Sequence, residues 1–318
     1  MAATLHQLHT DFLEELELGY GRSPKTVANY DHYLTRFFDQ QEIKEVSDIT
    51  LDTVRDFRRY LNDQRNVVPA TQNYHFIALR QFLKYLARRD IPALSSAKIN
   101  LAKLGERDID VLYPEEIDAL LQAPGVAREA TQKERPLDKY DELGFMRDLA
   151  MLAVLFSTGM RISELVRMNR DDIGHETNEL PVRGKGNKVR VVFLSDEAIA
   201  AISNYVNDRH DTDAALFVRH NPASRKAASG GSQEDLRITP RSIQRLIKKY
   251  AVVAGLTKNI TPHTLRHSFA TDLLTNGADV RQVQQLLGHA SITTTQVYTH
   301  LTDAHLREVH DKFHRRRT

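Results

Sequence analysis

The chain has 318 residues and a formal net charge of only +2, and 41% of its residues are hydrophobic. This length and composition predict a globular protein with enough apolar side chains for the cores of two domains. No apolar run is long enough to cross a bilayer, no secretory signal opens the sequence, and the absence of cysteine excludes disulfides and thiolate metal sites. A cytoplasmic protein with no membrane partner is therefore expected.

The first 95 residues predict an all-helical domain. Ser23 and Pro24 begin one helix, Asp48 or Thr50 precedes a second, and a third runs from about Thr71 to Arg88. The third helix carries three cations four residues apart on one side, namely Arg80, Lys84 and Arg88. Such a stripe fits either a solvated helix face or a contact with a DNA backbone.

Residues 96–110 show no hydrophobic period and predict a linker to a second domain, residues 111–318. Within that domain, the polar stretch from Ala123 to Asp141 is expected to be a surface loop. The nearly continuous apolar run from Phe145 to Phe156 predicts the central helix of the domain.

Two short motifs follow the central helix. Gly159 is expected to end it, and Arg161 enters the next helix, where Glu164 either orients the Arg161 guanidinium or is an ordinary exposed side chain. Two strand-like runs between Pro181 and Leu194 flank a Gly-Lys-Gly-Asn turn, which predicts a hairpin with Lys185 at its tip.

A basic helix is predicted from Pro240 to about Ala254. Its apolar positions recur at helical spacing and are expected to face inward. Its exposed side carries Arg241, Gln244, Arg245, Lys248 and Lys249.

The segment from Thr261 to Thr299 concentrates polar side chains at helix starts and turns. Thr261 and Pro262 are typical of an N-cap and a first helical residue, which places His263 in the first turn and Arg266 on nearly the same face. Because this end of a helix attracts anions, a phosphate is the expected ligand.

A second helix in this segment is expected from Asp279 to Leu287, ended by Gly288. His289 would then lie in the following turn, and Tyr298 on a short helix capped by Ser291.

Four motifs, TGMRISEL, GKGNK, HTLRHSFAT and LLGHASITTTQVYTH, resemble the tyrosine recombinase (phage integrase) family in residue type and order, and within it the Xer-type site-specific recombinases. The resemblance implies a catalytic set of Arg161, Lys185, His263, Arg266, His289 and the nucleophile Tyr298.

The resemblance also implies the fold and the partners. The expected fold is mainly α, a two-domain C-shaped DNA clamp with a helical SAM-like core-binding domain (1–95) and a mostly helical catalytic domain with a small antiparallel β-sheet (111–318). Candidate contacts with double-stranded DNA are Lys25, Asn29, Arg80, Lys84, Arg241, Gln244 and Arg245. A C-terminal helix at about 303–315 is expected to dock on a neighbouring subunit of a homo- or hetero-tetramer holding two DNA sites. Whether a DNA translocase activates the protein is left open.

The residue types suit strand exchange without a cofactor. A phenol at Tyr298 can hold the phosphate as a 3′-phosphotyrosine, which conserves the bond energy, so no nucleotide is required. Arg161 and Arg266 offer paired donors for the phosphate charge, so no metal is expected. The family role of Lys185 is to protonate the leaving 5′ oxygen. His263 would take the tyrosine proton or bind the phosphate, and His289 would donate to a non-bridging oxygen.

The expected function is site-specific recombination through a Holliday junction, in the manner of Xer resolution of chromosome dimers. A mobile-element integrase, a type IB topoisomerase and a non-catalytic DNA-binding architectural protein are the alternatives. His263 and His267 are four apart, a spacing that can bind zinc, but the arginine between them and the lack of a carboxylate disfavour a metal site.

Overall fold

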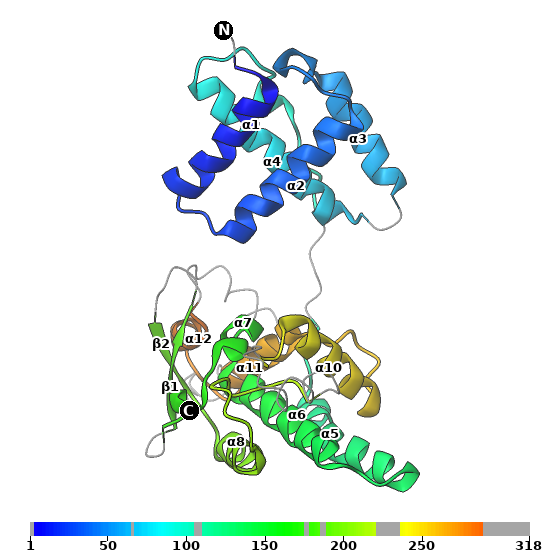
Figure 1. Ribbon diagram of the computed structural model, residues 1–318, viewed down its shortest axis with the longest axis vertical. Coiled ribbons are helices and arrows are strands. Elements are labelled where there is room, and N and C mark those ends of the chain that lie inside the picture. The colour runs from blue at the N-terminus through cyan, green and yellow to red at the C-terminus, as the bar shows by residue number, and fades with distance from the viewer. Residues whose placement is uncertain are drawn as a thin grey trace, which may run out of the picture. The chain divides into compact units, whose positions relative to one another are not determined.

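The computed structural model describes residues 3–64, 67–104, 110–174, 178–184, 189–220 and 236–288 (Figure 1). Contacts between Cα atoms divide the chain into two compact units, Met1–Arg107 and Asp108–Thr318. Each unit has its own hydrophobic core. Among the described residues, no helix is both long and apolar enough to span a membrane.

The regular elements among the described residues of the first unit are all helical. Its elements are α1 (Leu5–Glu14), a π-helical turn (Glu15–Gly19), α2 (Pro24–Gln40), α3 (Leu51–Asp63) and α4 (Pro69–Arg88), with 3-10 turns at Val46–Asp48 and Ser96–Lys98. The predicted start of α2 is confirmed, and of Asp48 and Thr50 it is Thr50 that caps α3. The Ser23 and Thr50 side chains accept hydrogen bonds from backbone N–H groups in the first turns of these helices. No helix is predicted from the sequence at α1.

The core of the first unit is aromatic. The rings of Phe37 and Phe57 meet edge to face, with centroids 5.1 Å apart, and Phe76 and Phe82 are fully buried beside them. The chain after α4 also packs on this core, since Ile99 is 2% exposed. The first unit therefore extends past residue 95.

The second unit combines helices with one small sheet. Its elements are α5 (Pro114–Glu134), α6 (Lys139–Thr158), α7 (Ile162–Arg167), a 3-10 turn (Arg170–Asp172), β1 (Glu179–Arg183), β2 (Val189–Phe193), α8 (Asp196–Asp208), α10 (Pro240–Val253), α11 (Pro262–Thr275) and α12 (Val280–Leu287). Strands β1 and β2 are antiparallel, and Pro181 pairs with Val191. The predicted fold class, mainly α with a small antiparallel sheet, is confirmed.

Helix α6 is the centre of this unit, as predicted. It packs against α5, α8 and α11, so Ala150, Met151, Leu152 and Val154 are all fully buried. A nearly continuous apolar run is expected where neighbours cover most of a helix. Gly159 ends α6 in the left-handed conformation at φ 58°, which also confirms the predicted C-cap.

The surface loop predicted between Ala123 and Asp141 is wrong. Helix α5 continues through Pro124 and Gly125 to Glu134, and α6 begins at Lys139. Pro124 is buried in α5, and the Arg128 guanidinium donates to both carboxylate oxygens of Glu142 on α6 at 2.6 and 2.7 Å. Packing against α6 and α10 outweighs the poor helix propensity of proline and glycine here.

Candidate active site

A pocket of about 580 Å³ lies in the second unit between α7, α10 and the start of α11. Its lining residues are Arg161, Ile162, Ser163, Arg241, Gln244, Arg245, Lys248, Ile260, Thr261, Pro262, His263 and Arg266. None of these twelve residues is acidic. The pocket joins three of the predicted catalytic residues to the three predicted DNA contacts of the basic helix.

The first turn of α11 forms as the sequence predicts. The Thr261 hydroxyl accepts a hydrogen bond from the Thr264 backbone N–H at 3.1 Å, and Pro262 takes the first helical position, where no N–H partner is needed. His263 is exposed in this turn, at the positive end of the helix dipole. An anion in the pocket would meet this end of α11.

Arg266 lies one turn further along α11 and joins two other helix ends. Its guanidinium donates to the Gly159 carbonyl at 2.6 Å and to the Leu287 carbonyl at 2.5 Å, and only 5% of the residue is exposed. These carbonyls lie at the C-termini of α6 and α12, where helices leave carbonyls without intrahelical partners. Arg266 therefore anchors both helices as well as lining the pocket.

Arg161 is the N-cap of α7 and is held by Glu164. The Glu164 carboxylate accepts hydrogen bonds from the Arg161 backbone N–H at 2.8 Å and from its Nη1 at 3.0 Å. The Arg161 side chain is 33% exposed and that of Glu164 only 3%. Of the two roles left open for Glu164, an ordinary exposed side chain is wrong, because the carboxylate is buried and orients Arg161.

A second arginine, Arg190 on β2, completes this cluster. Its Nη1 and Nη2 donate to the two Glu164 oxygens at 2.9 and 2.7 Å, and its Nε donates to the Leu286 carbonyl at 2.9 Å. Burial alone raises the pKa of Glu164, but the hydrogen bond from Arg190 and the bonds from Arg161 hold that pKa below its ordinary value. Glu164 is therefore a carboxylate at neutral pH.

Arg190 is not among the residues singled out from the sequence. The sequence gives no signal for it, because the strand VRVVF has three apolar side chains on the face opposite Arg190. In the structure that face is exposed and Val192 is buried, so strand alternation places Arg190 on the covered face. An arginine on the covered face of a strand requires a partner, since buried charges are paired.

The basic helix α10 has the orientation predicted from its sequence. Ile243, Leu246, Ile247, Tyr250 and Ala251 are buried, which confirms the expected inward face. Arg241, Gln244, Arg245 and Lys248 are exposed and line the pocket. One glutamine and three cations thus face the same space as Arg161 and His263.

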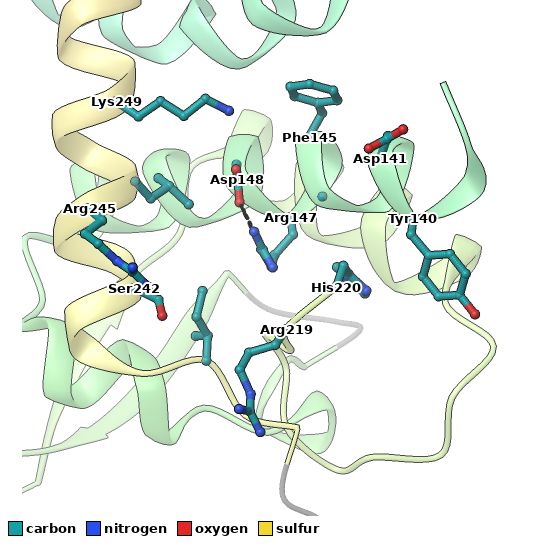
Figure 2. Close-up of a pocket in the computed structure, with 13 residues that line it drawn as sticks. Tyr140, Asp141, Phe145, Arg147, Asp148, Arg219, His220, Ser242, Arg245 and Lys249 are labelled. Carbon is teal, nitrogen blue, oxygen red and sulfur yellow. Dashed lines mark hydrogen bonds and ion pairs between the residues drawn. The ribbon is translucent and has the colours of Figure 1, made fainter. Parts of the chain in front are cut away.

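A second pocket, of about 560 Å³, lies against the adjacent face of α10 (Figure 2). At its wall, buried Asp148 accepts hydrogen bonds from Arg147 and, at 2.8 Å, from the Tyr250 hydroxyl. Burial and the adjacent carboxylate raise the pKa of Tyr250, so its hydroxyl stays a donor. The hydrogen bond from Tyr250 to Asp148 fixes α10 to α6. Arg245 lines both pockets.

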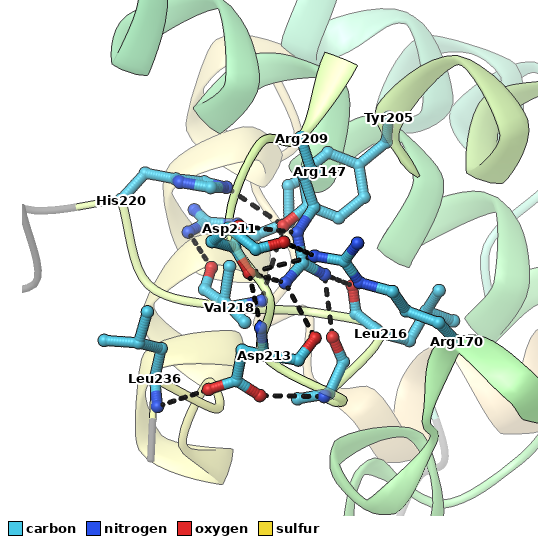
Figure 3. A network of polar contacts seen from close by, with 11 residues as sticks. Arg147, Arg170, Tyr205, Arg209, Asp211, Asp213, Leu216, Val218, His220 and Leu236 are labelled. Atoms are coloured by element: carbon cyan, nitrogen blue, oxygen red, sulfur yellow. Dashed lines mark hydrogen bonds and ion pairs between the residues drawn. The ribbon is translucent and has the colours of Figure 1, made fainter. Parts of the chain in front are cut away.

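A buried polar network holds the chain after α8 (Figure 3). The Arg209 guanidinium donates to the Ala215 and Leu216 carbonyls at 2.7 Å each and to the Asp211 carboxylate. Arg170 donates to the same carboxylate at 2.9 Å. The charged groups of this network bind one another, so its role is to stabilise the segment that leads from α8.

The predicted DNA contacts of the first unit lie on two of its helices. Lys25 and Asn29 are exposed on α2, and on α4 Lys84 is exposed and Arg80 half-buried. The third cation of the predicted stripe, Arg88, forms an ion pair with Glu15 at 2.7 Å. Its charge is therefore partly neutralised.

Three predicted catalytic residues, Lys185, His289 and Tyr298, lie outside the described residues, as does the expected C-terminal helix. The structure describes the strands on either side of the Lys185 turn. It also describes α12, whose cap Gly288 directly precedes His289 and has a φ of 63°. The predicted helix from Asp279 to Leu287 with a Gly288 stop is confirmed.

The chain belongs to the phage integrase (tyrosine recombinase) family. It matches the phage integrase family over residues 111–305 and the phage integrase N-terminal SAM-like domain over residues 8–93. The family predicted from the four motifs is thereby confirmed.

Curated relatives resemble the chain over nearly its full length. It is 34% identical over 311 residues to tyrosine recombinase XerD of Oceanobacillus iheyensis, covering 96% of this chain and 97% of the relative. It is 35% identical over 311 residues to tyrosine recombinase XerC of Natranaerobius thermophilus, with coverages of 96% and 98%.

Solved structures share the fold. The XerA recombinase matches with a TM-score of 0.51 and 28% identity, covering 97% of this chain and 99% of XerA. XerH bound to a palindromic difH substrate, in a post-cleavage complex, matches with a TM-score of 0.68 and 20% identity, with coverages of 97% and 84%.

Proposed function

We propose that this chain is a site-specific DNA recombinase that cuts and rejoins DNA through a 3′-phosphotyrosine and a Holliday junction. The observation that carries the proposal is that one pocket brings Arg161, His263 and Arg266 together with the basic face of α10. A pocket without acidic residues at the start of a helix suits a phosphodiester.

The reaction exchanges one phosphoester bond for another. The Tyr298 oxygen attacks the scissile phosphorus, the bond to the 5′ oxygen breaks, and Lys185 gives that oxygen a proton. The 5′ hydroxyl of the partner strand then attacks the phosphotyrosine and releases the tyrosine. The number of phosphoester bonds is unchanged, so no nucleotide is consumed.

The described residues bind the phosphate in this scheme. Arg161, partly exposed and oriented by Glu164, binds the non-bridging oxygens as their charge grows. His263, exposed in the first turn of α11, takes the tyrosine proton or bonds to the phosphate. Arg266 supplies positive charge at the pocket wall and holds α6 and α12 in place. In the same scheme His289, which lies outside the described residues, donates to a non-bridging oxygen.

DNA binding would use both units. We assign the core-binding role to the unit of residues 1–107 and the catalytic role to residues 108–318. In the second unit, Gln244 and the cations Arg241 and Arg245 face the pocket and are candidates for base and phosphate contacts. The corresponding candidates in the first unit are Lys25, Asn29, Arg80 and Lys84.

The biological role that we propose is Xer-like resolution of chromosome dimers in the cytoplasm. Relatives named XerD and XerC support it, since each aligns over nearly the whole of both chains. We further infer that the protein acts as a homo- or hetero-tetramer on two sites, joined through residues 303–315. Activation by a DNA translocase would fit this role.

The nucleophile can be tested with a nicked suicide duplex that carries a candidate recombination site. The wild-type protein should form an adduct with DNA that resists denaturation. Tyr298→Phe should abolish the adduct and leave DNA binding within about twofold, because only the attacking oxygen is lost. Tyr113→Phe, at a tyrosine that is 64% exposed, is the matched control and should form the adduct normally. An undiminished adduct with Tyr298→Phe would refute the assignment.

A further inference from the structure

Arg190 uses all three guanidinium nitrogens to connect separate parts of the second unit. Two nitrogens donate to the two Glu164 oxygens, in the paired geometry that makes arginine–carboxylate bonds strong. The third, Nε, donates to the Leu286 carbonyl at the end of α12. The Arg190 side chain is 11% exposed, so these bonds are largely shielded from water.

The cluster contains one carboxylate and two guanidinium groups. Glu164 accepts hydrogen bonds from Arg161 and Arg190 together, which leaves the three side chains with a net charge of +1. Without Arg190, Arg161 and Glu164 would form a neutral pair. With Arg161 as its single cationic partner, the buried Glu164 carboxylate would also bind the Arg161 guanidinium more tightly.

Arg190 also passes close to the end of α12. Gly288 has a φ of 63°, and a Cβ atom built there would lie 2.9 Å from the Arg190 Cδ. Glycine therefore provides both the left-handed backbone and the room for the arginine stem. The hydrogen bond from Arg190 to the Leu286 carbonyl joins strand β2 to the last turn of α12, three residues before His289.

We propose that Arg190 is a positioning residue that shares the Glu164 carboxylate with Arg161 and so leaves Arg161 a net positive charge for the scissile phosphate. This inference rests on the proposed recombinase function. Arg190 does not touch the DNA in this scheme. It acts through Glu164 on Arg161 and through Leu286 on the end of α12.

The test compares single-turnover cleavage of the suicide duplex at saturating protein, below the melting temperature of every variant. Arg190→Gln should lower the cleavage rate about tenfold or more and change the DNA dissociation constant by no more than about twofold. The double variant Arg190→Gln, Glu164→Gln should cleave faster than Arg190→Gln alone, because it restores the net charge of +1. Arg128→Gln, which breaks a two-bond pair with Glu142 on the surface, is the matched control and should cleave at the wild-type rate.

A second measurement separates positioning from a general loss of structure. A duplex with a methylphosphonate at the scissile position carries no charge there for Arg161 to neutralise. The ratio of wild-type to Arg190→Gln rates should therefore be smaller on this duplex than on the phosphodiester. An equal ratio on both substrates, together with no gain from the double variant, would overturn the inference. Absence of any adduct with the wild-type protein would instead overturn the proposed function, and this inference with it.

Discussion

Replacement of Gly159 by alanine tests how closely three helices meet beside the pocket. At φ 58°, a non-glycine residue costs about 1–2 kcal/mol. An added Cβ would also lie 2.3 Å from the Phe269 Cδ1 and 3.1 Å from the Leu287 Cδ2, and overpacking of this kind costs about 1–3 kcal/mol. The sum is a loss of about 2–5 kcal/mol, or roughly 4–20 °C in Tm for a unit of this size.

The matched control is Gly255→Ala. Gly255 has a φ of 71°, but a Cβ there would have no atom within 4 Å, so only the backbone cost of about 1–2 kcal/mol applies. Calorimetry of the full chain gives the Tm of each variant, and hydrogen exchange of peptides from α6 and α11 assigns the change to the second unit. Equal losses for the two variants would refute the close approach at Gly159. We also expect Gly159→Ala to impair DNA cleavage, because the Gly159 carbonyl accepts a hydrogen bond from Arg266.

Two further substitutions test buried polar groups of the second unit. Tyr250→Phe removes the hydroxyl that donates a hydrogen bond to buried Asp148, so the free energy of unfolding should fall by about 1–3 kcal/mol. Thermal unfolding measures this loss. A loss no larger than that of Tyr113→Phe would contradict the role of this bond. Burial, with the charges of His263 and Arg266, lowers the pKa of His267 to about 4. As the pH falls, His267 therefore becomes protonated in the unfolded chain before it does in the folded protein. The free energy of unfolding should fall as the pH falls from 7 to 5. His267→Gln should make this loss of stability between pH 7 and pH 5 smaller by about 1 kcal/mol, a figure reduced because the side chain is partly exposed. Hydrogen exchange at both pH values measures the difference. An unchanged pH dependence would contradict the lowered pKa of His267.

Local signals in the sequence account for much of the fold. The cap pairs Ser23-Pro24, Thr239-Pro240 and Thr261-Pro262 each begin a helix, and Gly159 and Gly288 each end one. These signals are reliable because caps and left-handed glycines depend on a few adjacent residues. The expected loop from Ala123 to Asp141 fails for the opposite reason. Its helix is stabilised by α6 and α10, which no local pattern reveals.

The candidate site was predictable in part. His263 and Arg266 share a helix with a clear start, so their proximity follows from the sequence. The burial of Glu164 does not follow from the sequence, because its spacing from Arg161 fits an exposed side chain equally well. Arg190 lies 26 residues further along the chain on another element. Only the folded arrangement shows that it shares the carboxylate with Arg161.

The bonds that Arg266 makes to two backbone carbonyls affect how its variants can be interpreted. A lysine has one nitrogen at the end of a flexible stem and cannot reproduce a planar fork that reaches both the Gly159 and the Leu287 carbonyls. A substitution there would loosen two helix ends before any substrate arrives. An inactive Arg266 variant is therefore informative about phosphate chemistry only when its folding in the absence of DNA is measured alongside.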